Sequence, residues 1–344
     1  MPEASPICLF RIPLTISVGS TVLAFAEGRP GLAQSVNPCG DGSGRSIWMR
    51  RSENAGRSWD AEPTPIVNDT DAWHEAIHDG GVLGAAVFER STKTVFLFYT
   101  TCYHKCWPTG PTTLFVKSES MGLHWSRPTN LTSLFLKEKI FMMQWGEGLG
   151  VQWPATNPHY PSRLLVCGWY NDQPKYGFAG VVCLGSDDVG AAWHVQGKLA
   201  GPVNEVGLAL LQNGSLLLNM RSAAMHRNRV QSMSNTGGAT FTALRDVLSL
   251  PDPVCNGGVT ALPGGTVVLT HDALAAGSTN RTRANMSIFT SSSGGDSWDA
   301  GHVLWSGPAA YSTVTPLGGS NVGVLYERGF KQDIENITFA SVRT

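Results

Sequence analysis

The sequence predicts an all-β fold, a six-bladed β-propeller that residues 1–344 form as a single unit. Three observations predict it: the composition, a series of short strand-like runs, and a motif that recurs along the chain. The composition includes 39 glycines, 20 prolines and 11 tryptophans, which suits short strands joined by tight turns better than a helical bundle. Because 42% of the 344 residues are hydrophobic, the chain can bury a large core, and a disordered chain is excluded.

Strand-like runs occur throughout the chain. They are rich in Val, Leu, Phe and Thr and are bounded by Gly, Pro, Asn or Ser, which is typical of short strands between turns. No long segment combines a helical period with helix caps. The runs are Thr21–Glu27, Ser46–Arg50, Thr94–Tyr99, Thr113–Lys117, Arg163–Cys167, Ser215–Asn219, Thr266–Thr270, Asn285–Phe289 and Asn321–Tyr326.

A motif recurs five times at intervals of about 60 residues. It consists of a Ser, a Gly four positions later and an aromatic residue seven positions after the Ser. The Ser can hydrogen-bond the turn's own backbone, the Gly permits a tight turn, and the aromatic side chain fills the gap between adjacent sheets. Units of this length with four short strands are typical of propeller blades, and 344 residues make about six of them. The copies are Ser52–Trp59, Ser118–Trp125, Ser186–Trp193, Ser234–Phe241 and Ser291–Trp298.

The charge balance argues against two classes of partner. The chain has 25 Lys plus Arg and 26 Asp plus Glu, for a formal net charge of -1. It therefore lacks the excess of positive charge with which proteins bind nucleic acids and anionic membranes. No apolar stretch approaches the roughly 18 residues of a transmembrane helix. The sequence predicts neither nucleic-acid binding nor a transmembrane segment.

The cysteines and the glycosylation signals bear on the compartment. Seven cysteines leave at least one thiol unpaired in a monomer. Cys102 and Cys106 can bridge one loop, whereas a zinc site with His104 lacks a second pair of ligands. The first five residues show no basic or apolar segment of a signal peptide. Localisation stays open, although six Asn-x-Ser/Thr sequons favour the secretory pathway or the lysosome: Asn68, Asn130, Asn213, Asn280, Asn285 and Asn336.

The recurring motif is similar to the Asp-box, Ser-x-Asp-x-Gly-x-x-Trp, although its third position is Asp only at Asp188, so the copies are degenerate. Together with other stretches, it makes the chain resemble the exo-α-sialidases over nearly its whole length, most closely those of the animal lysosomal type. The resemblance implies a six-bladed propeller that uses neither metal nor cofactor. It also implies the release of terminal sialic acid, with retention at the anomeric carbon, from sialylated glycoproteins, glycolipids and oligosaccharides. The other stretches are Phe10–Leu14, Leu23–Glu27, Val67–Asp69 and Phe96–Tyr99.

Three arginines are expected to bind the substrate. A sialic acid carries a carboxylate on its anomeric carbon, and guanidinium groups match a carboxylate better than ammonium groups do. The resemblance places the family's three arginines at Arg11 in Phe-Arg-Ile-Pro, at Arg221 in Asn-Met-Arg-Ser, and at Arg283, fifteen residues before Trp298. Arg281 lies two residues from Arg283, and strand alternation would point both the same way. Spacing alone therefore selects Arg283.

The resemblance also implies three catalytic residues. Tyr311 matches the nucleophile, since sialidases are the known tyrosine exception among glycosidases. A neutral phenol avoids the repulsion that a carboxylate would meet at a carbon already bearing one. Because its unperturbed pKa is about 10, a tyrosine nucleophile needs a neighbouring base, which Glu205 matches. Asp41, in Cys-Gly-Asp-Gly, matches the acid/base on a loop whose glycines would let it close over a substrate.

Three further charged residues are expected near the pocket. Glu27 and Arg29 match a charged pair at the floor of the family's pocket. We expect Glu27 to hold Arg11 in place, Arg29 to reach a ring substituent, and Glu327 to brace an arginine. For all three, a role in buried ion-pair scaffolding remains the alternative to substrate contact.

Other functions remain open. Two alternatives within the enzyme class are a pocket that selects a deaminated sialic acid and a trans-sialidase that transfers the sugar to an acceptor. A non-catalytic sialic-acid lectin would need only the arginines, so Asp41, Glu205 and Tyr311 favour an enzyme. A structural propeller without a glycan ligand would explain the Asp-boxes but not the arginines.

Overall fold

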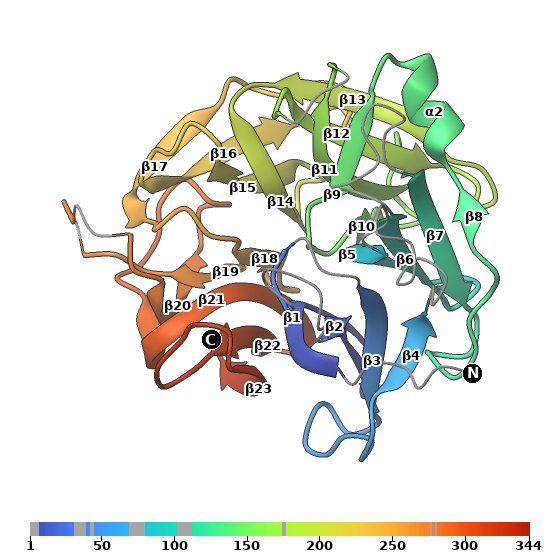
Figure 1. The fold of residues 1–344 in the computed structure, drawn as a ribbon. Coiled ribbons are helices and arrows are strands. Elements are labelled where there is room, and N and C mark those ends of the chain that lie inside the picture. The colour runs from blue at the N-terminus through green and yellow to red at the C-terminus, as the bar shows by residue number, and fades with distance from the viewer. Residues whose placement is uncertain are drawn as a thin grey trace.

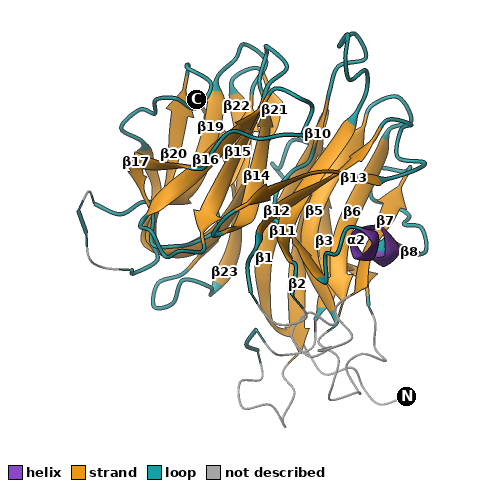
Figure 2. Ribbon diagram, turned by 90° about the horizontal axis from the view of Figure 1, so that it is seen from above, coloured by secondary structure: helices purple, strands orange, loops and turns teal. Residues whose placement is uncertain are grey.

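The computed structural model describes residues 7–30, 39–41, 45–68, 80–101, 112–173, 177–275, 277–278 and 281–344. Its strands form twisted antiparallel sheets that follow one another in chain order around a central axis, as in a β-propeller (Figure 1). Seen at right angles, the strands run roughly along that axis (Figure 2). All nine runs predicted as strands overlap strands of the structure. The all-β prediction is therefore confirmed.

The first two sheets each contain four strands in chain order. In the first sheet they are β1 (Ile7–Val18), β2 (Thr21–Pro30), β3 (Ser46–Ser52) and β4 (Thr64–Val67). In the second they are β5 (Gly81–Glu89), β6 (Thr94–Thr101), β7 (Thr112–Ser118) and β8 (Thr129–Asn130), followed by a short helix, α2 (Thr132–Lys137).

The remaining strands form three sheets. The third sheet has β9 (Met142–Trp145), β10 (Val151–Gln152), β11 (Leu164–Asn171), β12 (Gly180–Ser186) and β13 (His194–Ala200). The fourth has β14 (Val203–Leu210), β15 (Leu216–Ser222), β16 (Asn228–Ser234) and β17 (Arg245–Pro251). The fifth has β18 (Gly258–Ala261), β19 (Val267–Asp272), β20 (Ala284–Ser291), β21 (His302–Gly318), β22 (Asn321–Arg328) and β23 (Asn336–Arg343).

The number of blades predicted from the sequence was wrong. The sequence predicted six blades, whereas the described strands form five hydrogen-bonded sheets. The reason is the 17-residue strand β21, whose first part pairs with β20 and whose part from Ala309 onward pairs with β22. Strands expected in two separate blades are thereby joined into one six-stranded sheet.

All five copies of the recurring motif form the same turn. In each, the first Ser accepts a hydrogen bond from the backbone N–H of the Gly four positions later, at 2.9 to 3.0 Å. The third residue accepts another from the N–H four positions beyond itself, whether it is Asp188 or the serine Ser120. A side-chain oxygen is what this position needs, which explains why the Asp of the motif is so often replaced.

The motif glycines also pack each sheet onto the preceding one. A Cβ on Gly122 would approach Leu23 of the first sheet, and one on Gly190 would lie 2.2 Å from the ring of Phe96 in the second. A Cβ on Gly56, which follows β3 of the first sheet, would likewise meet the ring of Phe339 in β23 of the last sheet. The first motif therefore closes the ring.

Disulfides join Cys8 to Cys39 and Cys167 to Cys183, and among the described residues Cys255 is a buried free thiol. Cys102, His104 and Cys106 lie outside the described residues, as does one sequon asparagine, Asn280. The other five sequon asparagines are exposed, as glycosylation would require. In the ranges that the structure describes, no helix has the length and apolar character needed to cross a bilayer.

Candidate active site

A polar pocket of about 230 Å³ lies between the innermost strands of the ring. All eight residues that the sequence placed in the site line it: Arg11, Glu27, Arg29, Asp41, Glu205, Arg221, Arg283 and Tyr311. A larger hollow of about 440 Å³ lies elsewhere, between β1–β3 and β23, and contains none of them. We therefore take the smaller, charged pocket as the candidate site.

β-bulges place three of these side chains. The register of β1 shifts just after Arg11, that of β14 shifts across Glu205, and that of β21 shifts across Tyr311. After Arg11 the chain passes through Ile12 with a φ of 58°. A bulge bends its strand and re-aims side chains, and bulges are frequent beside active sites. Here they turn residues of three inner strands into one pocket.

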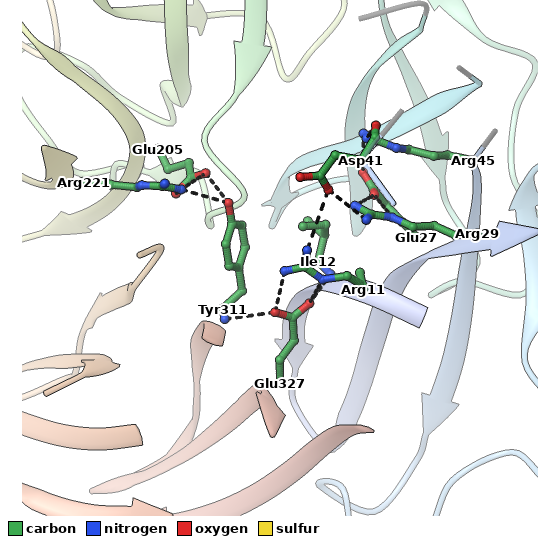
Figure 3. Close-up of polar contacts among 10 residues, drawn as sticks. All are labelled: Arg11, Ile12, Glu27, Arg29, Asp41, Arg45, Glu205, Arg221, Tyr311 and Glu327. Atoms are coloured by element: carbon green, nitrogen blue, oxygen red, sulfur yellow. Dashed lines mark hydrogen bonds and ion pairs between the residues drawn. The ribbon is translucent and has the colours of Figure 1, made fainter. Parts of the chain in front are cut away.

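Tyr311, Glu205 and Arg221 form a hydrogen-bonded group (Figure 3). The phenol of Tyr311 donates a hydrogen bond to Oε1 of Glu205. A guanidinium nitrogen of Arg221 lies 2.8 Å and 2.9 Å from the two oxygens of Glu205 and 3.1 Å from the phenol oxygen. The three groups come from β21, β14 and β15, so the fold brings together residues that are far apart in the sequence.

The surroundings keep the phenol protonated. Burial raises the pKa of Tyr311 well above its ordinary value of 10, and the neighbouring Glu205 raises it further, while Arg221 lowers it. The phenol can therefore attack as a nucleophile only if its proton passes to a neighbouring base. Glu205 already accepts the hydrogen bond of that proton, so it is placed to take it.

Arg11 is held by Glu327 rather than by Glu27. Nε and a terminal nitrogen of Arg11 each donate to a different oxygen of the buried Glu327, both at 3.0 Å. The expectation that Glu327 braces an arginine is confirmed. The expectation that Glu27 holds Arg11 is wrong, because Glu27 instead pairs with Arg29 at 2.9 Å and with Arg45 at 3.6 Å.

Asp41 lines the pocket beside Arg29 and Arg11. One carboxylate oxygen lies 2.9 Å from Arg29 and 3.7 Å from Arg11, while 70% of the side chain is exposed (Figure 3). Partial desolvation raises the pKa of Asp41, but Arg29, Arg11 and Arg45 outweigh it and hold the pKa below its ordinary value of 3.8. Residues 42–44, which include two of the three glycines expected to let this loop close, lie outside the described residues.

Arg283, rather than Arg281, lines the pocket. Its guanidinium lies 5.8 Å from the ring centre of Tyr311, and that of Arg11 lies at 5.5 Å. Both residues at 281 and 283 precede β20, which begins at Ala284, so strand alternation does not apply to them. The spacing argument that selected Arg283 agrees with its position.

The pocket also contains residues that the sequence did not indicate. Glu147 is one of them, and it lies between two glycines, as Asp41 does, which is a pattern that could have marked it. Asn204 precedes Glu205 and shares its bulge. Ile12 belongs to the Phe-Arg-Ile-Pro stretch, whereas the others had no local signal: Arg45, Val82, Gln144, Trp169 and Phe178.

A family model described as "BNR repeat-like domain" matches residues 41–324, which is most of the chain. The chain belongs to the BNR repeat-like domain family. All five Ser-to-Gly turns of this BNR repeat-like protein lie within the matched residues.

The BNR repeat-like chain is also similar to curated sialidases. It is 26% identical over 336 residues to a sialidase of Micromonospora viridifaciens, covering 93% of this chain and 50% of that protein. It is 24% identical over 240 residues to a sialidase of Bacteroides fragilis (strain YCH46), covering 67% of this chain and 41% of that protein. The chain therefore spans half or less of the length of these relatives.

Solved structures show the same fold. The Hadza microbial sialidase Hz136 superposes with a TM-score of 0.79 at 20% identity, covering 99% of this chain and 66% of that one. A leech intramolecular trans-sialidase complexed with 2,7-anhydro-Neu5Ac superposes with a TM-score of 0.72 at 16% identity, covering 100% and 70%. These similarities establish the propeller fold of the BNR repeat-like chain.

Proposed function

We propose that the chain is an exo-α-sialidase, a retaining glycoside hydrolase that releases terminal sialic acid from glycoproteins, glycolipids and oligosaccharides. The observation that carries the proposal is the hydrogen-bonded Tyr311 and Glu205 pair in a pocket lined by five arginines, which include Arg11, Arg221 and Arg283. Similarity to curated sialidases supports it. We further propose that residues 1–344 form one catalytic propeller.

The arginines would bind the carboxylate of the sugar. Arg11, Arg221 and Arg283 line one pocket with the phenol of Tyr311. Guanidinium groups bind a carboxylate through directed, charge-assisted hydrogen bonds. Because Glu327 and Glu205 hold Arg11 and Arg221 in place before substrate arrives, little ordering remains to be done on binding.

The reaction would proceed in two displacements. In the first, the phenol oxygen of Tyr311 attacks the anomeric carbon, its proton passes to Glu205, and the glycosidic bond breaks as Asp41 protonates the leaving oxygen. In the second, Asp41 takes a proton from water, the water oxygen attacks the anomeric carbon, and the phenol leaves with the proton that Glu205 returns. Two inversions give net retention.

Asp41 must be protonated when the leaving group departs. The three arginines around it hold its pKa low in the empty pocket. A bound substrate carboxylate would neutralise part of that positive charge, and this raises the pKa of Asp41 toward the working range. We therefore expect an acidic pH optimum for kcat, which reports the enzyme–substrate complex, with loss of activity as pH rises and Asp41 ionises.

Substitution of the three catalytic residues tests the proposal. Tyr311→Phe and Glu205→Gln should each lower kcat on a fluorogenic sialoside by at least about 100-fold, and Asp41→Ala should do so on a sialoside with an alcohol leaving group, which needs protonation. Tyr326→Phe is the matched control, because Tyr326 lies on the neighbouring strand β22 and does not line the pocket. Hydrolysis by Tyr311→Phe at the rate of the control variant would refute the assignment.

The product separates the enzyme from its alternatives. Free sialic acid of the α-anomer indicates a retaining hydrolase, whereas a 2,7-anhydro sugar or a transferred sugar indicates a trans-sialidase. Tight binding without any product would indicate a lectin. The closer likeness to animal lysosomal-type sialidases stays a prediction.

A further inference from the structure

The main chain of Arg45 is anchored between the first two sheets. Arg45 directly precedes β3, and its backbone carbonyl accepts a hydrogen bond from the N–H of Gly81, the first residue of β5, at 3.1 Å. Gly80 lies so close to the same carbonyl oxygen that a Cβ would collide with it, and its φ of 70° suits glycine. Arg45 therefore extends its side chain from a fixed position beside the pocket.

The side chain of Arg45 is buried and held by an acid. Arg45 is only 3% exposed, and its Nη1 lies 3.6 Å from Oε1 of Glu27. Glu27 is itself buried, pairs with Arg29 at 2.9 Å and accepts a hydrogen bond from the backbone N–H of Leu83 at 3.1 Å. A buried charge needs such partners, so the guanidinium of Arg45 has little freedom to move.

The other terminal nitrogen of Arg45 holds the main chain of Asp41. Nη2 donates a hydrogen bond to the backbone carbonyl of Asp41, four residues earlier (Figure 3). Arg29 and Arg11, by contrast, lie beside the carboxylate of Asp41. Arg45 therefore fixes where this residue stands, and it does so without occupying the oxygens that carry a proton.

This arrangement suits an acid/base. The carboxylate of Asp41 meets Arg29 and Arg11 through Oδ1, and 70% of the side chain is exposed. In the proposed reaction, that carboxylate must come within hydrogen-bond distance of the leaving oxygen and later of a water molecule. A hydrogen bond to the main chain limits how far the carboxylate can stray from the pocket and still lets the side chain turn.

Direct contact with the substrate is the alternative role for Arg45, because Arg45 also lines the pocket. The directions of its nitrogens argue against that role. Nη1 faces Glu27, Nη2 is bonded to Asp41, and Nε is buried. The guanidinium is thus directed at the protein, and the geometry favours a role that Arg45 exerts through Asp41.

We propose that Arg45 is a positioning residue for Asp41, whose main chain it holds so that the carboxylate can reach the leaving oxygen. The inference rests on the proposed sialidase function and gives a role to a residue that neither binds the sugar nor transfers a proton. Glu27 would support the same arrangement, since it pairs with both Arg45 and Arg29.

The first experiment compares two leaving groups in Arg45→Met, which keeps much of the length of the side chain but removes its donors and its charge. Sialyllactose has an alcohol leaving group that needs protonation, whereas an aryl sialoside needs little. The value of kcat/KM should fall about 10-fold or more on sialyllactose and less than about 3-fold on the aryl sialoside. Arg50→Met is the matched control and should change neither value, because Arg50 also donates to a backbone carbonyl, that of Ala61, but does not line the pocket.

The comparison of substrates distinguishes the possible causes. An arginine that contacts the sugar would affect both substrates alike, so equal losses in Arg45→Met and in the milder Arg45→Lys would overturn the inference. If the unmodified protein hydrolyses neither substrate, the proposed function fails instead.

The second experiment follows kcat/KM on sialyllactose against pH and separates the charge of Arg45 from its hydrogen bond. Partial burial raises the pKa of Asp41, but Arg29, Arg11 and Arg45 together hold it below its ordinary value. In Arg45→Met, the limb on which activity falls with rising pH should therefore move to higher pH. Arg45→Lys keeps the charge, so its limb should stay in place.

Arg45→Lys should still be impaired, because an ammonium group lacks the planar fork that reaches Glu27 and Asp41 together. We expect a loss of about 3- to 10-fold on sialyllactose and of less than about 2-fold on the aryl sialoside. Full activity of Arg45→Lys would mean that charge alone explains the effect. A limb that does not move in Arg45→Met would mean that Arg45 does not act on Asp41. Either result would overturn the inference.

Discussion

Glu327 shows how one buried carboxylate positions two parts of the site. Its two oxygens accept from the side chain of Arg11 and also from the backbone N–H groups of Ile12 and Tyr311, at 2.8 and 3.1 Å. The residue that would bind substrate and the residue that would attack it are therefore tied to the same side chain. Removing one partner of a buried ion pair is expensive, so this arrangement is rigid.

A pH-dependent difference in stability should follow from Glu147. Burial raises the pKa of Glu147 in the folded chain, whereas the pKa is ordinary in the unfolded chain. Between those two values the folded state keeps a proton that the unfolded state has lost, so the free energy of unfolding falls as pH rises, by up to about 1.4 kcal/mol per pH unit. Glu147→Gln carries no such proton and should be more stable than the unmodified protein, by a margin that grows from about pH 4 upward. Urea unfolding at pH 4, 6 and 8 measures it.

A stability difference that changes with pH identifies the proton on Glu147 as its cause. The raised pKa of Asp272 acts in the same direction but is present in both proteins, so it cancels from the difference. A margin that stays constant across this range would mean that the pKa of Glu147 is not raised in the folded chain.

The position of a single residue in the pocket could be predicted from the sequence where that residue belongs to a recognisable motif. Arg11 belongs to a recognisable four-residue stretch, and Tyr311 has a defined place after the last recurring turn. Glu147 belongs to no recognised motif, and only the glycine on either side of it could have marked it.

At the scale of elements, the bulges of the inner strands determine where the functional side chains point. Regular alternation along β14 would place Asn204 and Glu205 on opposite faces. The register shift between Val203 and Val206 relaxes that rule, and both residues line the pocket. A sequence pattern reveals a strand but not a one-residue insertion into its pairing, and for this reason the pocket was harder to predict than the sheets.

The Cys8–Cys39 disulfide should position Asp41. It links β1, three residues before Arg11, to the segment that carries Asp41 two residues later. Cys8→Ser with Cys39→Ser removes this link and should lower kcat about 10-fold on sialosides with an alcohol leaving group. Aryl sialosides should be affected much less, because a good leaving group needs little protonation. Steady-state kinetics on both substrate types measures the difference.

The second disulfide is the control for that comparison. Cys167 and Cys183 pair across β11 and β12, away from Asp41, and neither lines the pocket. Cys167→Ala with Cys183→Ala should alter both substrates equally. The same equal effect in the Cys8 and Cys39 variant would show that its disulfide stabilises the fold without positioning the acid.

At the scale of the whole molecule, the ring brings together residues from its two ends. Backbone N–H groups of Thr15 and Ser17 in β1 donate to Thr313 and Thr315 in β21, at 3.1 and 3.0 Å. The ion pair between Arg11 and Glu327 joins the same two sheets, and we call this contact between the first and last sheets the seam. The first and last sheets are thus joined by polar contacts beside the pocket and by packing of the first recurring turn on β23.

The ring itself could be predicted, but its seam could not. Repetition about every 60 residues indicated equivalent units, and equivalent units that pack side by side close into a ring. The number of sheets depended on β21, whose length and continuity do not follow from a repeat. The spacing of recurring turns says nothing about a strand that runs from one unit into the next.

Closure of this seam should contribute measurably to stability and activity. Gly56→Ala would place a methyl group against the ring of Phe339 at a φ of 83°, whereas Gly19→Ala adds one at a φ of 60° with no atom within 4 Å. Both substitutions strain the backbone by about 1 kcal/mol, but only the first also disturbs packing between the end sheets, for a total of about 2 to 4 kcal/mol. Because Arg11 and Tyr311 belong to the sheets on either side of the seam, Gly56→Ala should also lower kcat/KM, which Gly19→Ala should not. Urea unfolding and sialoside kinetics on the two variants test this, and equal values for both would mean that the ring holds together without the contact at Phe339.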